Sequence, residues 1–259
     1  MPSTASEKII YEHPLNEKTR TILRLEHLFR ESAFHLPKPD VWSSRAAITA
    51  LLDMVSIFAR ADIKADLIKE LDRHKGKLNS MRQTPGIDTE RLNHILRELD
   101  EISGRLYRFS GQIGQEIREN EFLKSIMQRS SIPGGSCDFD LPIYHYWLEQ
   151  PHEYRQAEIT HWLKTLTPID SAVELLLSLI RGSTTPTKEI AEQGFFQKSL
   201  DAQSPAQLIR VGLPKDARLV AEISGGKHRF SIRFLTPEEN ERPSPVKDDV
   251  PFSLNCCIL

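Results

Sequence analysis

The sequence has little cysteine, and its cysteines follow no regular spacing. Only three occur among 259 residues, and two of them are adjacent, Cys256 and Cys257. An odd number without paired spacing excludes a disulfide framework and the usual structural zinc patterns. We therefore expect three reduced thiols, no metal and no cofactor.

The chain also lacks a strong charge of either sign. Its formal net charge is -2, which gives no overall bias toward nucleic acid or membranes, so an electrostatic site must come from local clustering. It opens with polar residues, and we identify neither a secretory signal nor an apolar run long enough to span a bilayer. We expect a cytoplasmic protein without membrane insertion.

Recognisable catalytic motifs are scarce. The glycine-rich stretch Ser131–Cys137 lacks the Gly-Lys-Ser/Thr of a phosphate-binding loop, so it is better explained as a turn between helices. Cys137 and His145 could serve as nucleophile and base, but no orienting acid or oxyanion motif accompanies them. We expect no catalytic residue and no enzyme.

The last four residues, Cys256-Cys257-Ile258-Leu259, formally match a prenylation pattern. Asp248 and Asp249 lie where a basic run would support a lipid anchor. A cysteine-rich end to a last strand is the simpler interpretation, and the anchor remains the alternative.

Up to about Gly182, apolar residues recur at helical spacing. Four polar residues are expected to cap successive helices: Asn16, Ser44, Asp62 and Asp88. Thr167-Pro168 predicts the start of a later helix, and Gly182 predicts its end as the left-handed residue past the terminus.

After Pro186 the apolar period changes from helical to alternating. Four short segments read as strands: Phe195-Phe196, Leu208–Leu213, Arg218–Ile223 and Lys227–Leu235. Lys8–Glu12 could return to the same small antiparallel sheet, and Phe252–Leu254 could form an edge strand. The pattern predicts an α+β fold, with a mainly helical domain (15–182) joined to a small antiparallel β domain (8–12 with 194–256).

Positive charge gathers in this second part. Between Ser183 and Leu235, eight Lys or Arg stand against five Asp or Glu. Because strand side chains alternate between faces, three apolar residues should point inward: Phe230, Ile232 and Phe234. The opposite face should then carry Lys227, Arg229, Ser231 and Arg233.

A cationic row on an apolar backing suits an extended acidic peptide, because guanidinium groups donate paired hydrogen bonds to carboxylates. From spacing alone, a solvated sheet face with internal salt bridges is an equal alternative. Nucleic acid would also fit, but the segment lacks aromatic residues for base stacking on that face and the chain is not basic overall. We expect no nucleic-acid partner.

Four segments, in order along nearly the whole chain, resemble the ZapD family: 11–18 (YEHPLNEK), 67–73 (LIKELDR), 131–137 (SIPGGSC) and 227–234 (KHRFSIRF). This resemblance implies a non-enzymatic bacterial cell-division factor acting at the Z-ring at mid-cell. It further implies a helical domain joined to a β domain, a symmetric homodimer, and binding of the C-terminal tail of FtsZ to bundle its filaments.

The resemblance also implies which side chains contact that tail. Arg60, Arg229 and Arg233 match the family's basic binding surface by segment. Arg20, Arg118 and His145 match further positions associated with partner binding, although helix-surface salt bridges and ordinary packing explain these three equally well.

Overall fold

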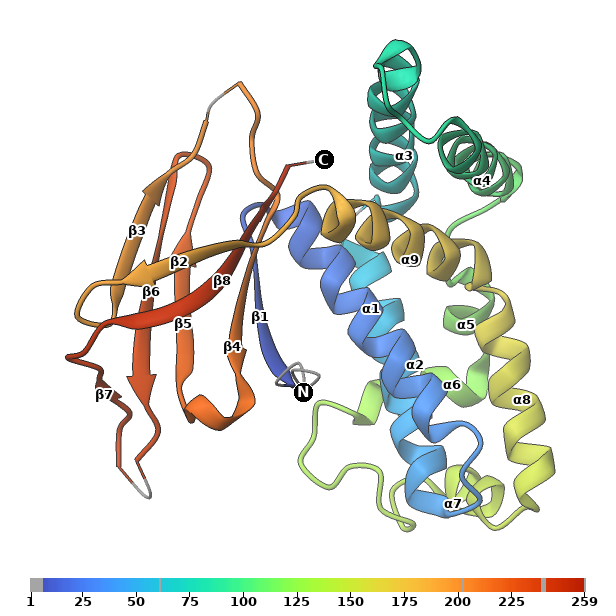
Figure 1. Cartoon of the computed structure of the whole chain (residues 1–259). Helices are drawn as coiled ribbons and strands as arrows, with labels where there is room; N and C mark the ends of the chain where they lie inside the picture. Colours follow the sequence, from blue (N-terminus) through green and yellow to red (C-terminus); the bar gives the residue numbers. More distant parts are fainter. Residues whose placement is uncertain (1–6, 61, 202, 239–240, 259) are drawn as a thin grey trace, which may run out of the picture. The chain divides into compact units, whose positions relative to one another are not determined.

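The computed structural model describes residues 7–60, 62–201, 203–238 and 241–258. The chain divides into two compact units: the described parts of residues 1–21 and 177–259, and residues 22–176. The strands belong to the first unit, and the second is helical (Figure 1). The fold class is therefore α+β, which confirms the prediction from sequence.

Helices occupy most of the chain between residues 17 and 182. Their bounds are α1 Glu17–His35, α2 Val41–Arg60, α3 Ile63–Ser80, α4 Thr89–Arg108, α5 Gln115–Glu119, α6 Glu121–Arg129, α7 Pro142–Leu148, α8 His152–Lys164 and α9 Thr167–Gly182. A short 3-10 turn, Met81–Gln83, follows α3.

Three of the four predicted helix caps are confirmed. In each, a side-chain oxygen accepts the backbone N–H three residues later, which satisfies a donor that the helix itself leaves free. The pairs are Asn16 with Thr19 (2.8 Å), Asp62 with Ala65 (3.2 Å) and Asp88 with Arg91 (3.0 Å).

The predicted cap at Ser44 is wrong. Helix α2 begins at Val41, and the Asp40 carboxylate accepts the Ser43 N–H at 2.8 Å. Ser44 lies buried in the first turn, where its hydroxyl accepts a hydrogen bond of 3.1 Å from Nε of Arg155. Asp and Ser have similar capping preferences, so the sequence alone could not choose between the two positions.

Helix α2 is long and apolar enough, by length and composition, to cross a membrane. This differs from our expectation from the sequence that no segment is long and apolar enough to span a bilayer. In the most apolar 18-residue stretch of α2, 56% of the residues are buried. Ile48, Leu51 and Met54 are almost completely enclosed. Burial in the helical unit therefore accounts for the apolar composition of α2.

Helix α9 has the predicted bounds, but its end is built differently. Gly182 is the last helical residue and does not belong to the described glycines with positive φ. Ser183 closes the last turn instead, because its backbone N–H (3.2 Å) and its hydroxyl (2.7 Å) both donate to the Ile180 carbonyl. The hydroxyl satisfies the helix end, so no left-handed glycine is needed.

The strands are β1 Lys8–Pro14, β2 Thr187–Ala191, β3 Phe195–Ser199, β4 Leu208–Pro214, β5 Val220–Gly225, β6 Arg229–Thr236, β7 Ser244–Pro245 and β8 Val250–Cys257. The five segments predicted first as strands, including Lys8–Glu12, are confirmed within a few residues of their ends. Strand β2 was not predicted.

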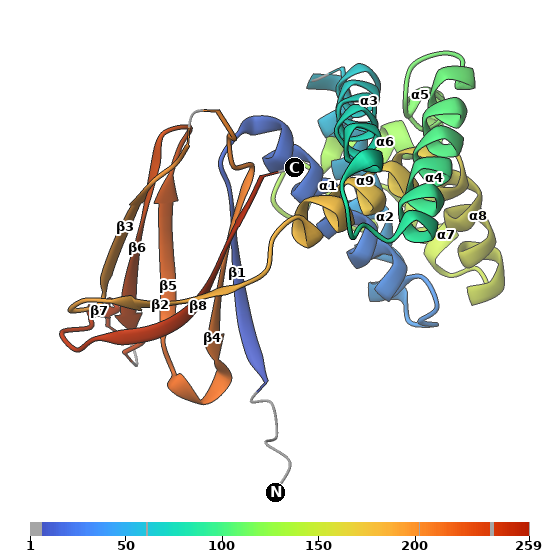
Figure 2. The same cartoon turned by 45° about the horizontal axis from the view of Figure 1, so that its top comes forward.

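The strands form two antiparallel sheets, not the single sheet that we predicted. One has the order β1-β4-β8-β2; in the other, β6 lies between β3 and β5 and also pairs with β7. Figure 2 shows β3, β6 and β5 side by side. Strand β8 lies between β4 and β2, so the prediction of an edge strand there is wrong. Alternation shows which side chains face inward, but not which strands pair.

A common apolar core lies between the two sheets. Both sheets contribute buried side chains to it, including Val211, Leu254, Phe230, Ile232 and Phe234. Three phenylalanine ring pairs within it, Phe196–Phe230, Phe196–Phe252 and Phe234–Phe252, have centroids 5.1–6.2 Å apart. This packing holds β6 rigidly from its inner side.

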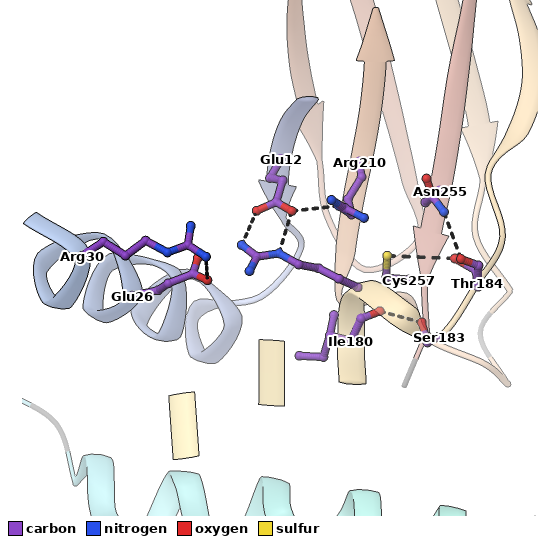
Figure 3. Close-up of polar contacts among 10 residues, drawn as sticks. Glu12, Glu26, Arg30, Ile180, Ser183, Thr184, Arg210, Asn255 and Cys257 are labelled. Atoms are coloured by element: carbon purple, nitrogen blue, oxygen red, sulfur yellow. Dashed lines mark hydrogen bonds and ion pairs between the residues drawn. The ribbon is translucent and has the colours of Figure 1, made fainter. Parts of the chain in front are cut away.

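An ion-pair cluster fixes the start of this unit. Glu12 on β1 accepts hydrogen bonds from Arg181 (2.7 and 2.8 Å) and from Arg210 (2.8 Å), and Figure 3 shows Glu12 beside Arg210. Burial alone would raise the pKa of Glu12, but Arg181 and then Arg210 outweigh it and lower the pKa below its ordinary value. The cluster ties the end of α9 to β1 and β4.

Candidate functional site

Strand β6 has the alternation predicted from the sequence. Phe230, Ile232 and Phe234 are buried, whereas Arg229 and Arg233 are exposed on the opposite face. The two arginines are four positions apart, so their Cα atoms lie about 13 Å apart along the strand. Both guanidinium groups therefore lie on one face of one rigid strand.

Strand pairing places neighbours on either side of this row. Arg233 lies between Phe195 on β3 and Glu222 on β5. Ser231 lies between Gln197 and Ser224, and Arg229 lies opposite Ser199. The outer face of this sheet thus combines two cations, a row of hydrogen-bonding side chains and one exposed aromatic ring.

Neither arginine is neutralised within the part of the chain that the structure describes. No carboxylate oxygen of a described residue lies within 4.0 Å of the guanidinium of Arg229 or Arg233. Glu222 is the opposite charge nearest in register to Arg233, and it is exposed. An internal salt-bridge network, the alternative from sequence, therefore does not occupy these two side chains among the residues that the structure describes.

A hollow of about 490 Å³ opens at the turn between β5 and β6. Its lining consists of Gln197, Ser224, Gly225, Gly226, Lys227, His228, Arg229, Phe230 and Ser231. Gly225 has no room for a side chain, because a Cβ there would lie 2.7 Å from the Cβ of Phe230. Glycine therefore allows the close pairing of Gly225 with Phe230 just before the turn.

Lys227 does not extend the strand row as predicted. Strand β6 begins at Arg229, and Lys227 is an exposed residue of the turn. The double glycine before it favours a turn, which overrides the alternation that we extended back to Lys227. Lys227 nevertheless lies beside Arg229 in the lining of the hollow.

Arg20 on α1 belongs to the same unit as β6. Burial and the nearby charge of Arg20 lower the pKa of His13, against a hydrogen bond to the Gly225 backbone that raises it. His13 thus lies close to both Arg20 and the β5–β6 turn. Arg20 also forms an exposed ion pair with Glu17 at 3.2 Å, so part of its charge is already paired.

Arg60 and Arg118 belong to the helical unit. Arg118 on α5 lines a second hollow of about 320 Å³, together with Phe58, Ala59, Asp62, Ile63, Lys64, Gly111, Gln112 and Ile113. Its Nη2 donates to Gln112 at 2.8 Å, and Lys64 Nζ donates to the Phe109 carbonyl at 2.6 Å. Arg60 is the exposed last residue of α2. We did not single out Lys64 from the sequence.

His145 on α7 is exposed and already has an acidic neighbour. Its Nδ1 lies 3.2 Å from an oxygen of Asp138, which also lies 3.7 Å from Nη2 of Arg45. Cys137 is exposed, and it shares no hydrogen bond with His145 in the described structure. Among the described residues, no group of three His, Cys, Asp or Glu side chains could hold a metal ion.

The structure also shows exposed aromatic residues that the sequence pattern did not reveal. Phe195, 44% exposed, lies beside Arg233 on the outer sheet face. In the helical unit, Trp42, Phe139 and Tyr146 are each at least 69% exposed. Alternation and helical spacing identify inward positions, so an outward aromatic residue gives no signal of its own.

Known proteins resemble this chain over nearly its whole length. Residues 23–233 match the family model described as ZapD, cell division protein. The cell division protein ZapD of Methylococcus capsulatus is 46% identical over 252 residues, covering 97% of this chain and 99% of that protein. The ZapD proteins of Ralstonia pickettii and a Janthinobacterium species are 41% and 39% identical, each covering 96% of this chain and 99% of the relative. The chain belongs to the ZapD family of cell division proteins.

Proposed function

We propose that this protein binds the C-terminal tail of FtsZ and, as a homodimer, cross-links FtsZ filaments at the Z-ring. Family membership supports a role in cell division. The observation that carries the proposal is the outer face of β6, where Arg229 and Arg233 are exposed on an apolar backing.

Exposed guanidinium groups on a rigid strand, without a carboxylate partner among the described residues, favour binding of an acidic peptide. Their strand is held from behind by Phe230, Ile232 and Phe234, so the backbone loses little conformational freedom when a ligand binds. Each guanidinium can donate two parallel hydrogen bonds to one carboxylate. An extended tail with carboxylates at matching intervals can therefore contact both arginines at once.

Further basic side chains contribute in this proposal. Lys227 lines the adjoining hollow. Arg20 lies near His13, which is hydrogen-bonded to the Gly225 backbone next to the same turn. Arg60, Arg118 and His145 belong to the helical unit, and we propose that they contact the tail or the filament beyond it. Existing partners such as Gln112 and Asp138 must then share or release these side chains.

Cross-linking requires two sites per particle. A two-fold dimer presents one tail site on each protomer, and a filament displays many tails. A weak individual contact then gains strength from effective concentration once the first site is occupied. In this proposal the protein acts without catalysis, cofactor, nucleic acid or membrane insertion, in the cytoplasm at the division site.

Charge reversal of the two arginines tests the binding site. An FtsZ tail peptide should bind Arg229→Glu and Arg233→Glu at least about tenfold more weakly than the wild-type chain at low salt. Lys188→Glu is the matched control, because Lys188 is exposed on β2 in the other sheet. Wild-type affinity in both arginine variants would exclude this face as the tail site.

Bundling requires its own test. FtsZ polymers should sediment at lower force and appear bundled in electron micrographs when the wild-type protein is added, but not when Arg233→Glu is added. Sedimentation equilibrium of the protein alone should give twice the chain mass. A monomer that still bundles filaments would contradict the dimer mechanism.

A further inference from the structure

The outer face of the β3-β6-β5 sheet differs at its two ends. At the turn, the hollow is lined mainly by polar and basic residues, with Lys227, His228 and Arg229 together. At the other end, Phe195 is 44% exposed beside Arg233, and Leu235 lies half-buried between Val220 and Pro245. The face therefore has a polar cationic end and an amphipathic end.

The polar end offers hydrogen-bond donors as well as charge. Gln197, Ser224 and Ser231 share the outer face by strand register, and all three line the hollow. The backbone N–H groups of Lys227 and His228 find no acceptor among the described residues. A compact anion with two oxygen atoms can accept several of these donors, whereas an apolar side chain can use none of them.

We infer that the hollow at the β5–β6 turn receives the free C-terminal carboxylate of the bound peptide, with the chain of the peptide running back along β6 toward Phe195. This inference rests on the proposed function, since it assigns the direction of the peptide at the same site. A terminal carboxylate fits because main-chain donors and basic side chains together recognise chain ends. Apolar side chains earlier in the peptide then lie beside Phe195 and Leu235.

Amidation of the peptide distinguishes a chain end from a side-chain carboxylate. Two tail peptides of identical sequence, one a free acid and one a C-terminal amide, are titrated into the full chain at low salt. The amide should bind the wild-type protein about fivefold more weakly, as expected for the loss of one charge-assisted contact. The side-chain carboxylates are the same in both peptides, so they cannot cause the difference.

A double variant locates the effect. Lys227→Ala/His228→Ala changes two exposed residues of a turn, so the fold should be retained. In this variant the free acid and the amide should differ by less than about twofold, because the side chains of Lys227 and His228 no longer contact the carboxylate and only the main-chain donors of the turn and the neighbouring side chains remain.

Each other outcome overturns a specific statement. Equal binding of acid and amide to the wild-type protein overturns the chain-end assignment and leaves the proposed function intact. An undiminished acid–amide difference in the double variant shows that the carboxylate binds elsewhere, which also overturns the assignment. Failure of both peptides to bind the wild-type chain overturns the proposed function itself.

Discussion

Arg233 on β6 lies directly across from Glu222 on β5, on the outer face of one sheet. Both side chains are exposed, and no ion pair within 4.0 Å joins them. Cross-strand neighbours lie close enough for their charges to interact. The proposed site therefore contains a carboxylate that repels an acidic ligand and competes with it for Arg233.

Removal of this carboxylate should strengthen binding. We expect Glu222→Gln to lower the Kd for the FtsZ tail peptide about threefold at low salt, with the gain diminishing as salt rises. Titration calorimetry at two salt concentrations measures the effect. Asp216→Asn, an exposed change of the same charge in the turn after β4, should leave the Kd unchanged. Weaker binding by Glu222→Gln would show that Glu222 positions Arg233 and does not compete.

Substitution of two phenylalanines in the same sheet should affect different properties: stability at Phe230 and tail binding at Phe195. Phe230 is 1% exposed and Phe195 is 44% exposed. Phe230→Ala should lower the free energy of unfolding by about 3–5 kcal/mol, because it leaves a cavity in the shared core. Phe195→Ala should change stability by less than about 1 kcal/mol but weaken tail binding severalfold. Denaturant unfolding and peptide titration of both variants test this contrast, which unchanged binding by Phe195→Ala would contradict.

Glu12 should stabilise the β unit only above acidic pH. Arg181 and Arg210 hold its pKa below the ordinary value of 4.5, so its contribution is present above that pH and is lost as the pH falls further. We expect Glu12→Gln to be about 2 kcal/mol less stable at pH 7, with the difference shrinking below about pH 4.5. Glu7→Gln breaks an exposed pair with Lys215 and serves as the control, with little effect expected. Equal stability of Glu12→Gln and wild type at pH 7 would rule out a structural role for the cluster.

His74 should make the helical unit sensitive to mild acid. It is completely buried, and burial, followed by the charge of Arg73, lowers its pKa from 6.5 to about 4. The unfolded chain therefore takes up a proton below pH 6.5 that the folded chain refuses until about pH 4, so stability falls across that range.

Between pH 7 and pH 5, the free energy of unfolding of the wild-type chain should fall by on the order of 2 kcal/mol more than that of His74→Leu. Thermal unfolding at both pH values measures the difference. Parallel pH dependence of the two proteins would show that His74 is not the group responsible.

Much of the fold could be predicted because local signals agreed with it. Asn16, Asp62 and Asp88 have short polar side chains just before apolar helical patterns, and all three cap helices. The two sheets could not be distinguished, because partner choice depends on contacts between distant segments such as β1 and β4. The end of α9 could not be predicted either. It depends on a hydrogen bond from the Ser183 hydroxyl, and the preference for glycine at helix ends does not indicate such a bond.

The candidate site was predictable only in part. Alternation alone placed Arg229 and Arg233 on one face, because the period of a strand is fixed by its geometry. Phe195 and Glu222 lie beside Arg233 because of strand register, which brings together residues that are far apart in the sequence. Alternation within one strand does not predict these neighbours. The grouping of Lys64 with Arg118 likewise depends on how helices pack, which no local pattern contains.

The order of the strands in the sheet determines when, during synthesis of the chain, the β unit can be completed. Strand β4 pairs on one side with β1, near the start of the chain, and on the other with β8, the last strand described. A ribosome that has released only residues up to 249 has supplied a whole helical unit but not the strand that joins β4 to β2. We expect the helical unit to fold while translation continues and the arginine face to become ordered only after β8 emerges, because Phe252 and Leu254 of β8 belong to the core behind β6. Chains that stop before β8 should therefore be unable to bind a ligand there.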